Sequence, residues 1–226
     1  MNPTARFPIV TVLLIVLNVL VFLYELSLGP VRGASLAALF SLVPNRLFSA
    51  ASAAAGQVSP SLTVLTSMFF HGGLVHLAGN MLYLWIFGNN IEDSMGRIRF
   101  LAFYLFCGVL AALSHAAMNL HSSIPMVGAS GAISGILGAY LVLYPRARVL
   151  TLFTLGFFVR MIEVPAVVVL GFWFVFQFLN ALLSGSQAGG VAWYAHLGGF
   201  IAGILLIGFF KHRTVPFWGK RGRYFS

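Results

Sequence analysis

Long apolar stretches alternate with short polar connections along this chain of 226 residues. Six of the stretches are each about 18–25 residues long, the length that a helix needs to cross a bilayer. They cover approximately residues 8–28, 64–88, 100–118, 127–144, 164–183 and 192–210. Polar and apolar residues do not alternate within them, which argues against a transmembrane barrel. The pattern therefore predicts an all-α membrane protein, a bundle of six transmembrane helices.

The composition agrees with a membrane protein and gives no sign of a second domain. The chain is 60% hydrophobic and 8% charged, with a mean hydropathy of +0.96, which no soluble domain of this length would tolerate. We therefore predict one membrane domain over residues 1–226, with its helical core at about 8–210. The first apolar run lacks a clear cleavage site and is expected to remain as a span. Cys107, the only cysteine, is expected to be a small residue that faces lipid or core.

Positive charge is distributed unevenly between the connections. If the N-terminus is cytoplasmic, eleven of the 13 Lys and Arg residues fall inside, and only Arg32 and Arg46 fall outside. This excess follows the positive-inside rule and predicts that both termini are cytoplasmic. The net charge of +9 is therefore attributed to topology, and no nucleic-acid partner is expected. The basic tail at 211–226 carries aromatic residues between its cations and is predicted to anchor at the membrane surface.

One connection is much longer than the others. Residues 29–63 separate the first two spans, a length of about 35 residues, and such loops tend to be functional. The loop is apolar and carries only two charges, whereas disordered segments have low hydrophobicity. We therefore predict that it lies in the outer membrane interface and is not a disordered spacer.

Three of the predicted spans carry polar residues close to their outer ends. The second contains His71, His76 and Asn80, the fourth contains Ser130, and the sixth contains His196. With a rise of about 1.5 Å per residue, these residues lie roughly 5–20 Å below the outer surface. Polar groups inside a membrane are usually there for function. We therefore predict one cavity that opens outward.

Glycines are spaced so that the fourth and sixth spans can approach closely. One stripe lies beside Ser130 and the other follows His196 at helical spacing: Gly131, Gly135 and Gly138, and Gly199 and Gly203. Small residues let helix backbones approach one another in lipid. Close approach would bring Ser130 within hydrogen-bond distance of His196, as a serine nucleophile and its base require.

The start of the fourth span has the parts of an oxyanion hole. Ser130 is predicted to begin its helix, so its backbone N–H is an unpaired donor at the positive end of the helix dipole. His76 and Asn80 share one face of the second span and would add side-chain donors to the same point. His71 is predicted to point about 140° away around that helix.

The sequence lacks the residues for two other kinds of protease site, a Ser-His-Asp triad and a zinc site. No Asp or Glu lies near the outer ends of the second, fourth or sixth span, so the sequence offers a Ser–His dyad and no Ser-His-Asp triad. A zinc protease would require a His-Glu-x-x-His pattern, which is absent. No metal and no cofactor is therefore predicted.

Three motifs together resemble those of the rhomboid family of intramembrane serine proteases: Gly128-x-Ser130-Gly131, His76-x-x-x-Asn80 and Ala195-His196-x-Gly198-Gly199. The resemblance covers about residues 8–210 and implies a six-helix core. It implies that Ser130 is the nucleophile, that His196 is the general base and later acid, and that His76, Asn80 and the Ser130 N–H stabilise the oxyanion. His71 would be a polar lining or water-retaining residue. The implied substrates are single-pass membrane proteins within the lipid bilayer.

The chain also departs from the family. Members often have a Trp-Arg pair in the first outer loop, and residues 29–63 contain no tryptophan. Some carry a tyrosine, stacked on the histidine, four residues after the nucleophile, where this chain has Ser134. We expect Ser134 to be a packing residue bonded to its own backbone. Another group must orient His196, and the sequence does not name it.

The remaining polar and aromatic residues have simpler interpretations. His115 and His121 flank the outer end of the third span and are predicted to be interfacial. Trp85, Trp173 and Phe174 are predicted to face lipid or the interface.

Two other functions stay open, a small transporter and a non-catalytic rhomboid-like protein that binds membrane helices. A transporter is disfavoured because the polar residues stop in the outer half and no inverted repeat is evident. A non-catalytic protein would be marked by loss of Ser130 or His196, and both are present. A bacterial plasma membrane is the simplest location for the chain, and its oligomeric state stays open.

Overall fold

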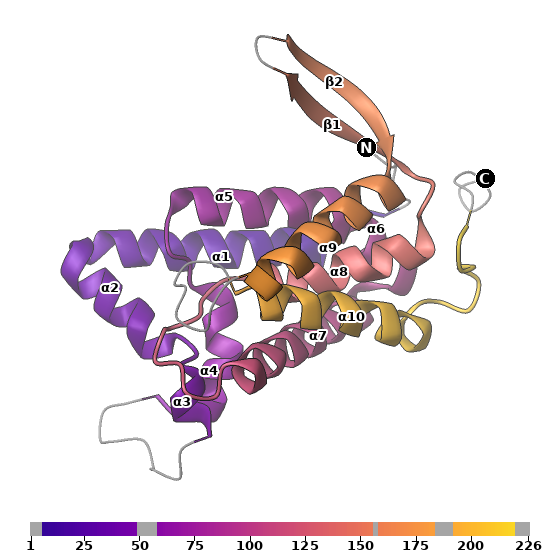
Figure 1. The fold of residues 1–226 in the computed structure, drawn as a ribbon. Helices are drawn as coiled ribbons and strands as arrows, with labels where there is room; N and C mark the ends of the chain where they lie inside the picture. The colour runs from indigo at the N-terminus through magenta and orange to yellow at the C-terminus, as the bar shows by residue number, and fades with distance from the viewer. Residues whose placement is uncertain (1–5, 49–57, 156–157, 184–191, 220–226) are drawn as a thin grey trace.

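The computed structural model describes residues 6–48, 58–155, 158–183 and 192–219, and these are mostly helical (Figure 1). Four helices are each long and apolar enough to cross a membrane: α1 (Ile9–Ser27), α7 (Arg97–Met118), α9 (Ala166–Leu183) and α10 (Trp193–Phe210). They coincide, to within one helical turn at either end, with the first, third, fifth and sixth predicted spans. Prediction succeeds here because each helix is a continuous apolar run between polar or glycine-containing connections.

The second predicted span is not one straight helix. Four short elements cover it: the end of α4 (Pro60–Thr66), the 3-10 helix η1 (Ser67–Phe69), α5 (Leu74–Tyr83) and the π-helical η2 (Leu84–Gly88). The chain then continues into α6 (Asn89–Met95). The parts before and after residues 70–73 are bent by 81° relative to each other. The break contains Gly72 and Gly73, and glycine lowers the preference for helix. The prediction of an uninterrupted helix over 64–88 is therefore wrong.

The fourth predicted span is shorter than expected. The helix α8 (Ser130–Leu143) has 14 residues, and at about 1.5 Å per residue it is roughly 21 Å long, less than a hydrocarbon core of about 30 Å. Its start is delayed because Gly128 has a φ of 127°, which is incompatible with a helix. The described residues thus contain four helices of spanning length, or five if the bent pair forms one span. The predicted count of six is not confirmed.

The structure contains a β-hairpin, which the all-α prediction did not include. Strands β1 (Arg148–Leu155) and β2 (Phe158–Pro165) pair antiparallel, with Arg148 opposite Pro165. The side chains of Arg148 and Glu163 form an exposed ion pair at 3.6 Å. Valine, isoleucine, threonine and phenylalanine are frequent in this segment, and such residues favour strands. The hairpin extends away from the helices in Figure 1.

The described part of the long loop is ordered against the rest of the fold. It forms α2 (Gly29–Phe40) and α3 (Pro44–Leu47). Leu42, which is fully buried, exchanges two backbone hydrogen bonds with Met126, at 3.0 and 2.8 Å. The loop therefore braces the segment that leads into Ser130. Its position in the membrane interface stays a prediction. Residues 49–57 of the loop and 220–226 of the basic tail lie outside the described residues.

The core of the bundle is built around α8, which packs against α7 and α10. A β-carbon at Gly199 would collide with the carbonyl oxygen of Gly131, and one at Gly138 with that of Phe200. The predicted close approach of these two glycine stripes is thereby confirmed. Cys107 is fully buried beside Gly135, so it faces the core and not lipid.

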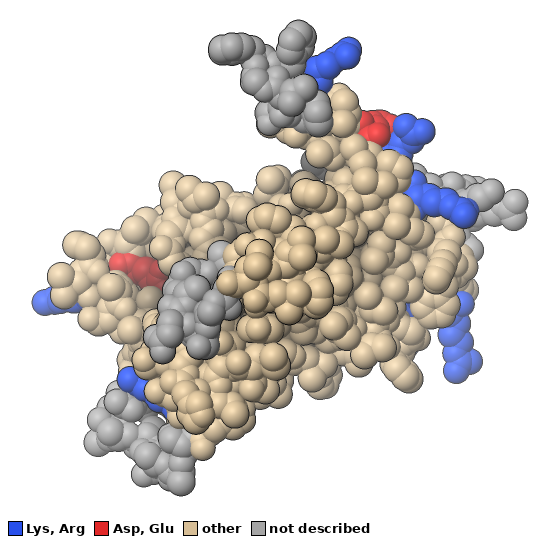
Figure 2. Space-filling view, in the orientation of Figure 1, with Lys and Arg blue, Asp and Glu red and all other residues tan. Residues whose placement is uncertain are grey.

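Both chain ends of the helical bundle lie at the same end of the molecule. The start of α1, the hairpin and the end of α10 are gathered there, opposite α2 and α3 (Figure 1). Lys and Arg side chains are more frequent at this end than at the other in the view of Figure 2. The buried carboxylate of Glu92 on α6 holds the start of α1, accepting hydrogen bonds from the backbone N–H groups of Val10 and Thr11 at 3.0 and 2.8 Å. This arrangement agrees with termini on one side, and their cytoplasmic placement stays a prediction.

Candidate active site

The turn before α8 places Ser130 at the first position of the helix. Gly128 adopts a φ of 127° and donates its backbone N–H to the carbonyl of Ser67 at 2.9 Å. Ala129 caps the helix, and Ser130 begins it. The backbone N–H of Ser130 is consequently one of the first-turn donors for which an α-helix supplies no acceptor. Ser130 itself lines the cavity.

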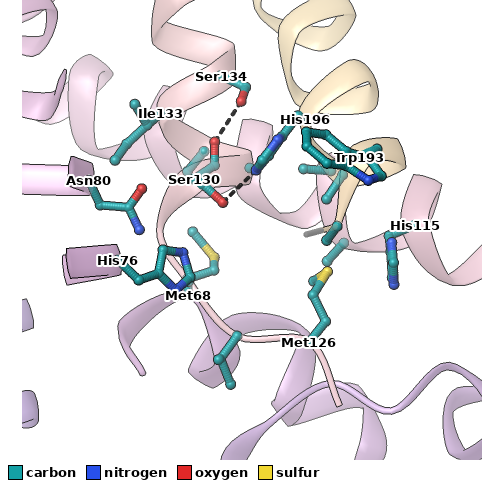
Figure 3. Close-up of a pocket in the computed structure, with 18 of the residues that line it drawn as sticks. Met68, His76, Asn80, His115, Met126, Ser130, Ile133, Ser134, Trp193 and His196 are labelled. Atoms are coloured by element: carbon teal, nitrogen blue, oxygen red, sulfur yellow. Dashed lines mark hydrogen bonds between the residues drawn. The ribbon is translucent and has the colours of Figure 1, made fainter. Parts of the chain in front are cut away.

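The Ser130 and His196 side chains meet between α8 and α10. Oγ of Ser130 and Nε2 of His196 lie 2.8 Å apart and form a hydrogen bond (Figure 3). His196 lies in the first turn of α10 and is buried. The glycine contacts between the two helices hold them close enough for this short hydrogen bond. A hydroxyl that donates to an imidazole is the arrangement that activates a serine nucleophile.

The other ring nitrogen of His196 faces a residue that the sequence did not assign to the site. Nδ1 of His196 lies 2.6 Å from Oε1 of Gln177 on α9. Trp173, one turn earlier on α9, packs its ring against the imidazole, with ring centroids 5.9 Å apart. The prediction that Trp173 faces lipid or the interface is therefore wrong. Trp193, on α10, approaches the imidazole edge-on from another side, at 6.3 Å.

A sequence signal for Gln177 existed. It is one of two uncharged polar residues in the otherwise apolar α9, and the rule that singled out Ser130 and His196 applies to it equally. Asn180 on the same helix meets the rule too, but it is only partly buried and its amide donates to the backbone carbonyl of Phe176 in an exposed hydrogen bond. The sequence alone does not separate these two residues, because only tertiary packing sets which face of α9 turns inward.

His76 and Asn80 lie across the cavity from His196, on α5, and face Ser130 (Figure 3). The Nδ2–H of Asn80 donates to Nε2 of His71 at 2.9 Å, and His71 is buried. The prediction that His71 points away around the helix is wrong, because the chain leaves the helix before Gly72 and Gly73. The rings of His71 and His76 consequently touch edge to face, with centroids 5.2 Å apart.

The cavity between these walls has a volume of about 980 Å³. It is lined by α5, α7, α8, α10 and the segment before α8, with Trp173 contributed by α9. The described residues that line it include no Asp, Glu, Lys or Arg, and its polar character comes from hydroxyl, imidazole, amide and backbone groups. His115 lines the cavity as well, so it is not simply interfacial. Ser134 donates its hydroxyl to the carbonyl of Ser130 at 2.6 Å, which confirms the expected backbone bond.

The fold and the site together define an integral membrane protein of helices with a serine–histidine pair in a cavity. The family model for the Rhomboid domain matches residues 59–213, which include the bent second span, α8, the hairpin, α9 and α10. The chain therefore belongs to the rhomboid family.

Several curated proteins of this family are similar to the chain. Rhomboid protease GluP of Bacillus subtilis (strain 168) is 32% identical over 215 residues, covering 95% of this chain and 37% of that protein. Rhomboid protein 1, mitochondrial, of Saccharomyces cerevisiae is 32% identical over 155 residues, 66% of this chain and 41% of that protein. The bovine presenilin-associated rhomboid-like protein, mitochondrial, is 35% identical over 92 residues, 40% of this chain and 24% of that protein.

The chain spans less than half the length of each of these relatives. They come from a bacterium and from mitochondria, so the comparison favours neither membrane. The bacterial plasma membrane stays a prediction.

Proposed function

We propose that the chain is an intramembrane serine endopeptidase that cleaves single-pass membrane proteins, with Ser130 as the nucleophile and His196 as the general base. The observation that carries the proposal is the hydrogen bond of 2.8 Å from Ser130 Oγ to His196 Nε2, at a helix start that faces His76 and Asn80. Membership of the rhomboid family supports it, because rhomboids are generally intramembrane serine proteases.

The proposed reaction follows from the positions of these groups. A substrate segment leaves its helical conformation, because a helix keeps its carbonyl oxygens in its own hydrogen bonds. Ser130 Oγ attacks the carbonyl carbon while its proton passes to Nε2 of His196. His196 then gives this proton to the leaving amine as the C–N bond breaks, which leaves an acyl ester on Ser130. Water attacks the ester carbon and gives a proton to His196, which passes it to Ser130 Oγ as the C–Oγ bond breaks, so the carboxylic acid product leaves and the hydroxyl is regenerated.

Negative charge develops on the substrate carbonyl oxygen during both attacks. We assign its stabilisation to the Ser130 backbone N–H at the start of α8 and to side-chain donors of His76 and Asn80. The His76 and Asn80 side chains lie on the opposite side of Ser130 from His196 (Figure 3), so we assign the oxygen to their side and the proton transfer to the imidazole. The bond from Asn80 to His71 would hold the amide close to this pocket.

Two features support a protease over the alternative functions. A family member that only bound membrane helices would need neither the serine hydroxyl nor an imidazole bonded to it. A transporter would need polar lining from one end of the bundle to the other, whereas the described cavity gathers its polar groups around the starts of α8 and α10.

The proposal is tested with a model single-span substrate in liposomes. Wild type should cleave it, and Ser130→Ala and His196→Ala should not. Ser134→Ala is the matched control, because that hydroxyl is bonded to its own helix, and it should stay active. Cleavage by Ser130→Ala would exclude Ser130 as the nucleophile. A fluorophosphonate should label wild type only where both Ser130 and His196 are intact, and a binding protein or transporter would give no such labelling.

A further inference from the structure

Both ring nitrogens of His196 are engaged, by partners from two different helices. Nε2 faces Ser130 Oγ on α8 at 2.8 Å, and Nδ1 faces Gln177 Oε1 on α9 at 2.6 Å. The Gln177 and His196 side chains are buried, with exposed fractions of 5% and 9%. We propose that Gln177 is a positioning residue that holds His196 in the tautomer and orientation required of the base, in the place that a carboxylate occupies in a Ser-His-Asp triad. The inference rests on the proposed protease function.

The argument concerns the single proton of a neutral imidazole. To accept the proton of Ser130, Nε2 must be unprotonated, so the ring hydrogen must lie on Nδ1. A buried N–H without an acceptor is costly, and Oε1 of Gln177 supplies that acceptor. The tautomer of a histidine is set by the hydrogen bond of its other nitrogen. In the opposite tautomer two acceptors, Nδ1 and Oε1 of Gln177, would face each other at 2.6 Å, and Nε2–H would donate to the Ser130 hydroxyl and could not take its proton.

An amide suits this environment better than a carboxylate. A charged group within a membrane bundle is expensive unless it is paired, and none of the described cavity-lining residues is a Lys or Arg that could pair with it. The other ionisable side chains that interact electrostatically with His196 are His76 and His115. An amide oxygen accepts the Nδ1–H without adding charge to this site. This explains how the histidine of the proposed protease could be oriented without a carboxylate.

The neighbouring turn of α9 reinforces the assignment. Trp173 and Gln177 are four residues apart, so they lie on one face of the helix. The Trp173 ring packs against the imidazole, with 5.9 Å between centroids. The amide oxygen of Gln177 contacts Nδ1 at the edge of the imidazole. Together they restrict both the tilt and the rotation of the His196 ring.

The first test compares two substitutions with a matched control on the same helix. Gln177→Leu keeps the approximate size and removes the acceptor, and kcat should fall by about 10- to 100-fold with little change in KM, below the loss that a wrong tautomer causes in a triad. Gln177→Glu keeps an acceptor for the Nδ1–H, but its negative charge favours the imidazolium form of His196. Its activity should therefore recover as the pH is raised, with the acid limb of its kcat/KM profile above that of wild type. Asn180→Leu should match wild type, because that amide makes only an exposed hydrogen bond to its own helix.

The second test does not depend on cleavage. In wild type with ¹⁵N-labelled histidine rings, the His196 signals, assigned by their loss in His196→Asn, should report a protonated Nδ1 and an unprotonated Nε2. Gln177→Leu should shift this toward a mixture of tautomers. A protonated Nε2 in wild type overturns the inference even if no substrate is cleaved. Wild-type cleavage that depends on Ser130, with kcat and tautomer unchanged in Gln177→Leu, overturns the inference and leaves the proposed protease standing.

Discussion

The α-carbon of Gly203 on α10 lies so close to the carbonyl oxygen of Gly135 on α8 that a β-carbon at Gly203 would collide with it. Only glycine permits this approach of two helix backbones. The contact matters for the site because Ser130 and His196 lie on these two helices within about two turns of it. The distance between nucleophile and base is therefore set by backbone contact as well as by their own hydrogen bond.

We expect Gly203→Ala to force α8 and α10 apart. Overpacking of this kind typically lowers the free energy of unfolding by about 1–3 kcal/mol, and lengthening the Ser130–His196 contact should lower kcat as well. Both are measured in detergent, by thermal unfolding and by cleavage of the model substrate. The control is Gly208→Ala on the same helix, where the nearest atom to a new β-carbon, Phe217 Cζ, is at 3.5 Å. Equal effects of the two substitutions would contradict this account.

The site positions that follow from the spacing of residues along a helix could be predicted from the sequence. Glycine stripes report which helix faces meet, and a serine and a histidine beside those stripes must then lie near each other. The structure accordingly brings Ser130 and His196 together, and it places His76 and Asn80 opposite them. These positions depend on local spacing and on the order of the spans, and both can be read from one chain.

The parts that the sequence did not predict depend on tertiary packing. Gln177 and Trp173 face His196 because of the way α9 is rotated, and its nearly uniform apolar surface gives no periodic signal for that rotation. His71 contacts Asn80 because the chain bends at Gly72 and Gly73, whereas hydropathy shows only one apolar run over 64–88. The count of six spans is not confirmed for a related reason: the apolar segment 127–144 contains a helix of only 14 residues, and an irregular start is tolerated where protein surrounds the chain.

Asn80 and His71 should act as a unit. Asn80→Ala should lower kcat by about 10- to 10³-fold, because one donor is removed from the proposed oxyanion pocket. His71→Ala should give a smaller loss, because it frees the Asn80 amide without removing it. The double variant should be no worse than Asn80→Ala alone. The rates are measured as single turnovers in liposomes, with Asn180→Ala as a control. Additive losses would show that Asn80 and His71 act independently.

Glu92 is expected to fasten α1 to the bundle without taking part in catalysis. Its carboxylate accepts two backbone N–H bonds and the Thr11 hydroxyl, the last at 2.8 Å. Glu92→Gln keeps the shape but loses the charge and one acceptor oxygen, so the free energy of unfolding should fall by about 1–3 kcal/mol. Glu163→Gln is the matched control, since its ion pair with Arg148 is exposed and worth little. A double-mutant cycle with Thr11→Val should show coupling, and its absence would argue against the contact.

Gly128 links the backbone before α8 to the proposed oxyanion pocket. Its φ of 127° is a conformation that residues with a β-carbon rarely adopt. A β-carbon there would also lie 2.8 Å from Cε1 of the His76 ring and 3.6 Å from Nδ2 of Asn80. Gly128→Ala should therefore strain the turn by about 1–3 kcal/mol and push the His76 ring away from the pocket. Turnover should fall by about 10-fold or more.

The two causes can be separated by combining Gly128→Ala with His76→Ala. If crowding of the imidazole is the main cause, Gly128→Ala should lower kcat much less when His76 is already absent. If backbone strain displaces Ser130 itself, the loss should be the same in both backgrounds and fluorophosphonate labelling should fall with it. Gly79→Ala on α5 is the control, because a β-carbon there meets no atom within 4 Å, and it should keep wild-type turnover. An equal loss in both backgrounds would place the function of Gly128 in the geometry of the Ser130 turn and remove crowding of His76 as its cause.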